Sequence, residues 1–196
     1  MTILIKHRVN TINNLKKTDK KYGLEIDIRT WKQKLILSHD PFKVGTNFEQ
    51  WLNYYNHAFL ILNTKEEGLE KKVLFLMNKF NIKNFFFLDQ SFPFLLKTCL
   101  KGESRIAARY SEFESIETVK KLKSLVQWVW VDTFTKFPLT KKNYIYLKKN
   151  NFKLCLVSPE LIDLKKKNLI SKFKKQLKIN KFDFDAICTK FPNKWL

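Results

Sequence analysis

The stretch GLEIDIRTWKQKLILSHD, residues 23–40, decides how this sequence of 196 residues is interpreted. Its first half is an apolar run of strand length that contains two acids, Glu25 and Asp27. Side chains two positions apart on a strand point to the same side, so the two carboxylates share one face and their aliphatic neighbours occupy the other. We therefore predict a buried strand whose two acids lie on the face that carries the function.

Two carboxylates held this close repel each other, and each raises the pKa of the other unless a cation lies between them. A hard divalent ion with oxygen ligands, Mg²⁺ or Ca²⁺, would remove the repulsion. The alternative is structural: one or both acids form an ion pair with Arg29 or a nearby lysine. The spacing of the acids alone leaves both readings open.

Short apolar runs alternate with amphipathic segments along the whole chain. Eight runs have the length and the β-branched, aromatic or aliphatic content of strands: 3–6, 24–28, 58–62, 85–88, 105–108, 128–131, 153–157 and 185–188. Apolar residues recur at helical spacing in 65–80, 112–125, 139–150 and 159–179. Ser111, which is followed by two acids, is a candidate N-cap for the second of these helices.

Strands that alternate with crossover helices imply parallel pairing, and eight such strands imply a closed barrel. The predicted fold class is α/β, a small (βα)8 TIM-type barrel with short loops, formed by residues 1–196 as a single domain. The run 35–38 departs from strict alternation and is expected to be a short strand or an extended loop.

The formal net charge of +20 favours an anionic partner or substrate. A nucleic-acid role is disfavoured, because the lysines are scattered in pairs along the chain and no nucleic-acid recognition motif accompanies them. No window approaches a membrane span, and MTILIKHRVN at residues 1–10 lacks the apolar core of a signal peptide, so we expect a cytoplasmic protein. The three cysteines, Cys99, Cys155 and Cys188, are expected to be small core residues.

In a barrel of this type, functional groups lie at the C-terminal ends of the strands. Acids, histidines and cations occupy those positions here: His7, Arg8, Glu25, Asp27, His39, Asp40, Asn63, Lys65, Asp89, Arg109, Asp132, Thr189 and Lys190. We expect these side chains to converge on one rim.

Three segments together resemble the signature of the glycerophosphodiester phosphodiesterase family, which belongs to the barrel phosphodiesterases with phosphatidylinositol-specific phospholipase C and sphingomyelinase D. They are HRVNT at 7–11, GLEIDIR at 23–29 and LILSHDP at 35–41. Weaker similarity continues in LNTK at 62–65, QSFP at 90–93 and DFDAICTKFP at 183–192. Two histidines that bracket an acid pair form the specific part of this resemblance.

The resemblance implies a metal-dependent phosphoric diester hydrolase that acts on an anionic phosphodiester substrate. His7 and His39 would be the general acid and base, Arg8 would hold the phosphoryl group, and Lys65 would support the phosphate charge. These residue types suit the chemistry, because cations must neutralise the charge that grows on the phosphoryl oxygens while imidazoles move protons near neutral pH.

The resemblance also implies that Glu25 and Asp27 bind Mg²⁺ or Ca²⁺. The third-strand acid of the family is replaced here by Asn63, whose amide oxygen is a weaker ligand. Asp89 is the favoured replacement because it falls at a strand end, and other acids that follow the strands are further candidates: Asp132, Glu66 and Glu67.

Several functional alternatives stay open at this point. The nucleophile is water in a hydrolase, or a hydroxyl of the substrate in a lyase or transferase that releases a cyclic phosphate. Asn63 favours a third alternative, a catalytically decayed barrel that binds phosphate without turnover. The short segment 41–57 predicts an open mouth that suits a phosphodiester from a polymer or a lipid head group.

Arg109 and Asp132 lie at predicted strand ends to which no family motif assigns a role. Arg109 is a candidate second clamp for a phosphate or carboxylate of the substrate. The equally weighted alternative is a mutual ion pair that closes the rim.

Overall fold

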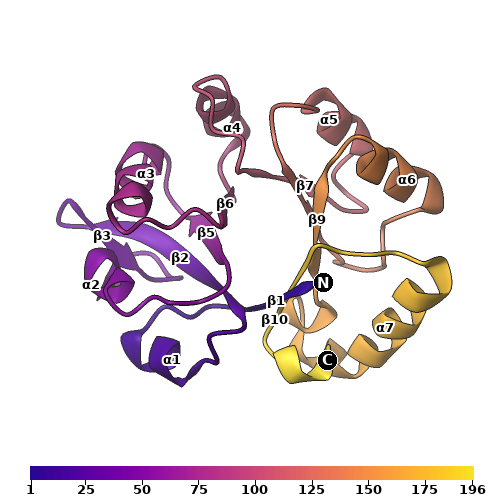
Figure 1. Cartoon of the computed structure of the whole chain (residues 1–196), viewed down its shortest axis with the longest axis horizontal. Helices are drawn as coiled ribbons and strands as arrows, with labels where there is room; N and C mark the ends of the chain where they lie inside the picture. Colours follow the sequence, from indigo (N-terminus) through magenta and orange to yellow (C-terminus); the bar gives the residue numbers. More distant parts are fainter. The chain divides into compact units, whose positions relative to one another are not determined.

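The computed structural model describes residues 1–196 and shows a mixed α/β fold in which strands and helices alternate along the chain (Figure 1). The strands are β1 (Ile3–Lys6), β2 (Gly23–Trp31), β3 (Lys34–Leu37), β4 (Thr46–Asn47), β5 (Leu60–Thr64), β6 (Phe85–Leu88), β7 (Ala107–Tyr110), β8 (Trp128–Val131), β9 (Lys153–Val157) and β10 (Ala186–Thr189). The predicted fold class, α/β, is confirmed.

The α-helices are α1 (Ile12–Lys17), α2 (Phe48–Leu52), α3 (Glu70–Lys79), α4 (Phe92–Cys99), α5 (Ile116–Lys121), α6 (Lys141–Lys149) and α7 (Leu169–Asn180). Three short 3₁₀ helices are η1 (Pro159–Leu161), η2 (Leu164–Asn168) and η3 (Pro192–Lys194). None of these helices is long and apolar enough to cross a membrane.

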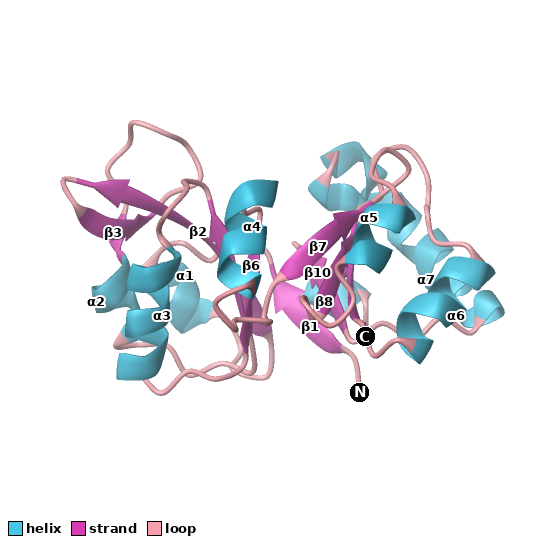
Figure 2. Ribbon diagram, turned by 90° about the horizontal axis from the view of Figure 1, so that it is seen from above, coloured by secondary structure: helices cyan, strands magenta, loops and turns pink.

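The chain forms two compact units, one made of Lys6–Glu103 and the other of Met1–Ile5 with Ser104–Leu196. We call them the site unit and the C-terminal unit. Figure 2 distinguishes the helices and the strands within each of them.

In the site unit, β2 lies between a parallel and an antiparallel neighbour. It pairs in parallel with β5, which pairs in parallel with β6, and the register places Asp27 opposite Asn63. On its other side β2 pairs antiparallel with β3, which in turn pairs with β4. The run 35–38 is therefore a short strand, and its direction explains why it departs from the alternation.

In the C-terminal unit, β7, β8, β9 and β10 pair in parallel in chain order. The first strand joins this unit through its beginning, because the backbone N–H of Ile3 donates to the carbonyl of Asp185 at 2.9 Å. The pairings support parallel strands with crossover helices in both units. They do not establish the closed ring that the count of eight parallel runs predicts.

Apolar side chains from the strands form the core of each unit. All four residues of β6 are buried, as are all four of β8, which fits strands that are covered on both faces. The three cysteines are buried and free, and burial raises the pKa of the Cys155 thiol well above its usual value. They are small core residues, as predicted.

Three element boundaries differ from the sequence predictions. The strand predicted at 105–108 is β7, two residues later, so Arg109 lies within the strand. Ser111 does not cap a helix: its hydroxyl closes a tight turn with Glu114, and α5 begins later with Ser115 as its N-cap. The helix predicted over 159–179 is divided, because the Asp163 side chain accepts from the N–H of Lys165 and competes with the helical pattern.

Candidate functional site

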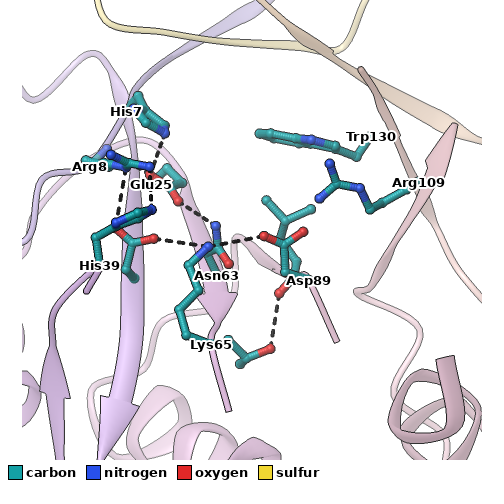
Figure 3. A network of polar contacts seen from close by, with 12 residues as sticks. His7, Arg8, Glu25, His39, Asn63, Lys65, Asp89, Arg109 and Trp130 are labelled. Carbon is teal, nitrogen blue, oxygen red and sulfur yellow. Dashed lines mark hydrogen bonds and ion pairs between the residues drawn. The ribbon is translucent and has the colours of Figure 1, made fainter. Parts of the chain in front are cut away.

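Polar side chains converge in the site unit at and just beyond the C-terminal ends of its strands (Figure 3). Two follow β1, two lie on β2, one follows β3, one lies on β5, one follows β5 and one follows β6. In chain order they are His7, Arg8, Glu25, Asp27, His39, Asn63, Lys65 and Asp89. Asn63 lies on the strand itself, and not after it as the sequence suggested.

The acid pair of β2 is almost completely buried, with Glu25 and Asp27 each 1% exposed. The alternation of the strand places them on the same side, while Leu24 and Ile26 are fully buried on the other. Burial of two neighbouring carboxylates is costly unless both are hydrogen-bonded or ion-paired. The contacts of each oxygen therefore determine what this site can do.

Glu25 is held by hydrogen bonds to both carboxylate oxygens. Its Oε2 accepts from the backbone N–H of Arg8 at 2.8 Å, and its Oε1 accepts from Nδ2 of Asn63 at 3.0 Å. Nε2 of His7 lies 3.7 Å from Oε2. Burial, followed by the charge of Asp27, raises the pKa of Glu25 to about 7.

Asp27 is held by Asn10 and faces two cations. The amide of Asn10 donates to Oδ2 at 2.8 Å and accepts from the backbone N–H of Asp27 at 2.9 Å. Nζ of Lys65 lies 3.3 Å from Oδ1, and Nε of Arg8 lies 3.9 Å from Oδ2. The carboxylate of Asp27 thus lies beside two positively charged side chains.

Lys65 also contacts Asp89, whose Oδ2 lies 3.2 Å from Nζ. The backbone N–H of Lys65 donates to the carbonyl of Ile28 at 3.0 Å, which extends the β2 and β5 pairing to this residue. One ammonium group therefore bridges a carboxylate that lies on β2 and one that follows β6. Its side chain is only 18% exposed.

His39 contacts Arg8 on one side of its ring and Asp40 on the other. Its Nε2 lies 2.5 Å from Nη2 of Arg8, and its Nδ1 lies 2.9 Å from Oδ1 of Asp40. Arginine can only donate, so Nε2 accepts and the ring proton is on Nδ1. The hydrogen bonds from Lys43 and His39 hold the pKa of Asp40 down at about 2.

Two residues of the site have an uncommon backbone conformation. Arg8 has φ of 56° and Asp89 has φ of 62°, both in the left-handed region. Non-glycine residues in that region cost about 1–3 kcal/mol each and persist where the surroundings fix them. At Arg8 that support includes the neighbouring bond from the N–H of Val9 to the carbonyl of Glu25.

The residues present do not fit a divalent cation. No group of three or more histidine, cysteine, aspartate or glutamate side chains is arranged to hold a metal ion. The carboxylate oxygens of Glu25 and Asp27 already face N–H donors or the ammonium of Lys65. Oδ1 of Asn63 and Oδ1 of Asp27 are buried without a hydrogen-bond partner, and the Asp27 oxygen faces the ammonium of Lys65. Two such oxygens are far from the six or more oxygen ligands that Mg²⁺ or Ca²⁺ takes.

Two cavities of the site unit differ in their relation to these residues. A cavity of about 320 Å³ is lined by Lys65, Asp89 and neighbouring residues of the β5 and β6 loops. A larger one, about 960 Å³, is lined by residues around β3, α2 and α3 and by none of the candidate site residues. The smaller cavity is the one that reaches candidate site residues, namely Lys65 and Asp89.

Arg109 belongs to the C-terminal unit and is ion-paired there. Its Nη2 lies 2.5 Å from Oδ2 of Asp132, and its Nε lies 3.1 Å from Oε1 of Glu114. The indole N–H of Trp130 donates to the other oxygen of Asp132 at 3.2 Å. The mutual ion pair, one of the two roles left open by the sequence, is present, and the role of Arg109 as a substrate clamp stays a prediction.

Two further residues have roles that the sequence did not reveal. Asn10 holds Asp27, and its position inside the HRVNT segment was the only available signal. Glu66, a candidate replacement for the missing third acid, instead binds the N–H and hydroxyl of Thr30 and lies 3.7 Å from Arg29. The Glu66 carboxylate is thus engaged by residues at the end of β2.

The chain matches no protein-family model and no curated protein at the sequence level. Its structure is similar to that of a glycerophosphodiester phosphodiesterase from Agrobacterium tumefaciens, with a TM-score of 0.70 and 13% identity over 100% of this chain and 97% of the other. It is also similar to a glycerophosphoryl diester phosphodiesterase from Parabacteroides distasonis, with a TM-score of 0.64 and 11% identity over 99% and 84% of the two chains. The chain therefore has the fold of these proteins over nearly its whole length.

Proposed function

We propose that this chain is a phosphoric diester hydrolase that cleaves a glycerophosphodiester-like substrate at the site around His39 and Arg8. The single observation that carries the proposal is the contact between these two side chains beside the buried acid pair. The shared fold of the solved phosphodiesterases supports it. The proposal includes closure of the parallel strands into the small barrel predicted from the sequence.

A phosphodiester resists attack because it is anionic, so the site must neutralise charge on the phosphoryl oxygens. Arg8 is suited to this task, because its guanidinium is 43% exposed and offers a planar set of donors for phosphate oxygens. Lys65 lines the cavity of about 320 Å³ and supplies a second positive charge. Both cations are held in place by Asp27 before the substrate binds.

His39 is the proposed general base. Its proton is on Nδ1, facing Asp40, so the lone pair of Nε2 becomes available when Arg8 turns to the phosphate. It takes a proton from water, which attacks phosphorus as the ester bond to the leaving oxygen breaks. His7, near Glu25, is the proposed general acid that protonates the leaving alkoxide. The products are an alcohol and a phosphomonoester, and each proton transfer contributes about 10²–10⁴ in rate.

No step of this proposal passes through a metal ion. Mg²⁺ or Ca²⁺ would supply further neutralisation of the phosphoryl charge where a site for it existed. Glu25, Asp27, Asn63 and Asp89 would have to hold the ion. The three carboxylates are engaged by hydrogen bonds or by the ammonium of Lys65, and the neutral Oδ1 of Asn63 alone would be a weak ligand.

Product analysis in ¹⁸O-labelled water tests the proposed reaction. Hydrolysis places the label in the phosphate of the product, whereas attack by a substrate hydroxyl gives an unlabelled cyclic phosphate. A panel of glycerophosphodiesters with different head groups identifies the leaving alcohol. An unlabelled cyclic phosphate as the product, or the absence of both products with every substrate, would contradict the proposal.

A second candidate function is phosphate binding without turnover, and Asn63 is the observation that favours it. The amide lowers the negative charge of the site relative to a third carboxylate. Binding of a glycerophosphodiester, measured by calorimetry, together with unchanged substrate after long incubation would support this function and exclude catalysis.

A further inference from the structure

We infer that Lys65 is the resident cation of this site and that its ammonium group takes the place of a divalent metal ion. The inference deepens the proposed function. It rests on that function only where it concerns catalysis, because catalysis without a metal ion requires that the chain is a hydrolase. It concerns which cation holds the acids together, a property that can be measured without turnover.

The first support is the position of the ammonium group between two carboxylates. Nζ of Lys65 lies 3.3 Å from Oδ1 of Asp27 and 3.2 Å from Oδ2 of Asp89. Asp27 lies on β2 and Asp89 directly follows β6. A positive charge between carboxylates from two strands is what a bound metal ion would provide here, and the chain provides it by itself.

The second support is the residue opposite Asp27 on the neighbouring strand. Asn63 pairs in register with Asp27, and its Nδ2 donates to Oε1 of Glu25 at 3.0 Å. A carboxylate at position 63 could only accept, so it would repel Glu25 and require a further cation. The amide instead donates a hydrogen bond to Glu25. The positive charges of Lys65 and Arg8 are then sufficient to balance the carboxylates of the site.

The third support is that Asn10 and the backbone of Arg8 donate further hydrogen bonds to the two acids of β2. Asn10 donates to Oδ2 of Asp27 at 2.8 Å, and the N–H of Arg8 donates to Oε2 of Glu25 at 2.8 Å. A divalent ion would have to displace several of these donors to find enough oxygens. The site is therefore organised around hydrogen bonds and one ammonium group.

Calorimetric titration with Ca²⁺ and with Mg²⁺ tests the inference on the whole chain. We expect no saturable binding by the wild-type protein at about 1 mM, the weak end of the range of protein calcium sites. We expect the double variant Asn63→Glu with Lys65→Met to bind Ca²⁺ saturably, because it restores a third carboxylate and removes the competing cation. Lys79→Met, which removes a surface ion pair with Glu49, is the matched control and should bind no metal.

Thermal unfolding gives a second readout if the double variant does not fold. Lys65→Met alone leaves Asp27 buried without its nearest cation, so its melting temperature should fall, and Ca²⁺ should raise it again. Ca²⁺ should not shift the melting temperature of the wild-type protein. Saturable binding by the wild type that is lost in Asp27→Asn would overturn the inference, as would a Lys65→Met variant with unchanged stability.

The outcomes separate this inference from the proposed function. Wild-type protein that binds metal at the acid pair and hydrolyses a phosphodiester overturns the inference alone. Wild-type protein that binds no metal and hydrolyses no phosphodiester overturns the proposed function alone. Hydrolysis that persists at full rate in a chelator supports both.

Discussion

Nε2 of His39 lies 2.5 Å from Nη2 of Arg8, although 31 positions separate the two residues in the chain. Arg8 follows β1 and His39 follows β3, so the contact joins the segments that come after two different strands. Since the guanidinium donates, the contact fixes the tautomer of the ring and directs a lone pair of the proposed base toward the group proposed to bind phosphate. In the proposed mechanism, proton transfer and charge neutralisation therefore act at one point.

Asp40→Asn should reduce kcat, because Asp40 positions His39 through Nδ1 and stabilises the ring when it becomes charged. The loss should be smaller than that of His39→Gln, which removes the whole contribution of a base, about 10²–10⁴-fold. Steady-state kinetics give the kcat and KM of both variants. An Asp40→Asn variant with unchanged kcat and an unchanged pH profile would show that Asp40 does not position the base.

Glu25 should make the protein less stable as pH rises. Its pKa is about 7 in the folded protein against 4.5 for the free side chain, so the folded state binds the proton more tightly. The stabilisation that the protonated Glu25 gives the folded state is fully present below pH 4.5. It is lost as the pH rises to about 7, which lowers the free energy of unfolding by about 3 kcal/mol. Urea unfolding at several pH values should show a flatter profile for Glu25→Gln, whereas Glu49→Gln on the surface should follow the wild type.

Arg109→Met should destabilise the C-terminal unit by leaving the carboxylate of Asp132 buried without the guanidinium that pairs with it. Asp132 is 2% exposed, and removal of one partner from a buried pair costs about 3–5 kcal/mol. Because the side chain of Arg109 is itself one-third exposed, we expect the loss of stability to lie near the low end of this range. Glu114→Gln, at the more exposed partner, should cost at most about 1 kcal/mol. Equal costs for the two variants, measured by denaturant unfolding, would contradict this ranking.

Asn10→Ala should destabilise the site unit and weaken phosphodiester binding together. The substitution removes two hydrogen bonds to Asp27, each with a net contribution of about 1 kcal/mol. Freed from Asn10, the carboxylate can turn away from Arg8 and Lys65, so KM should rise more than kcat falls. Asn10→Asp, which keeps the size but loses the amide donor, should be at least as damaging because it places another carboxylate beside Asp27.

The parts of the fold that depend on local patterns were predictable from the sequence. The apolar runs located the strands, and the alternation in β2 placed Glu25 and Asp27 on one face. Helix boundaries that depend on competing hydrogen bonds were not predictable from the sequence. Nothing in the sequence distinguishes Ser111, which closes a turn, from Ser115, which caps α5. The direction of β3 was likewise open, because a short apolar run pairs equally well in either orientation.

The site divides in the same way. The identity of the polar residues at the strand ends followed from the sequence, but the partner of each oxygen did not. Whether Asp27 faces a lysine or a metal ion depends on how the loops after β5 and β6 turn. The role of Asn63 as a donor to Glu25 depends on the register between β2 and β5, which is a non-local property.

The most direct test of the central claim is hydrolysis of a glycerophosphodiester by four proteins in buffer that contains Mg²⁺ and Ca²⁺. The wild type and His57→Gln should both release a phosphomonoester, because His57 bonds the carbonyl of Thr18 and lies outside the site. His7→Gln and His39→Gln should lose most of the activity while retaining the fold. Equal turnover by all four proteins, or none by the wild type, would contradict the account.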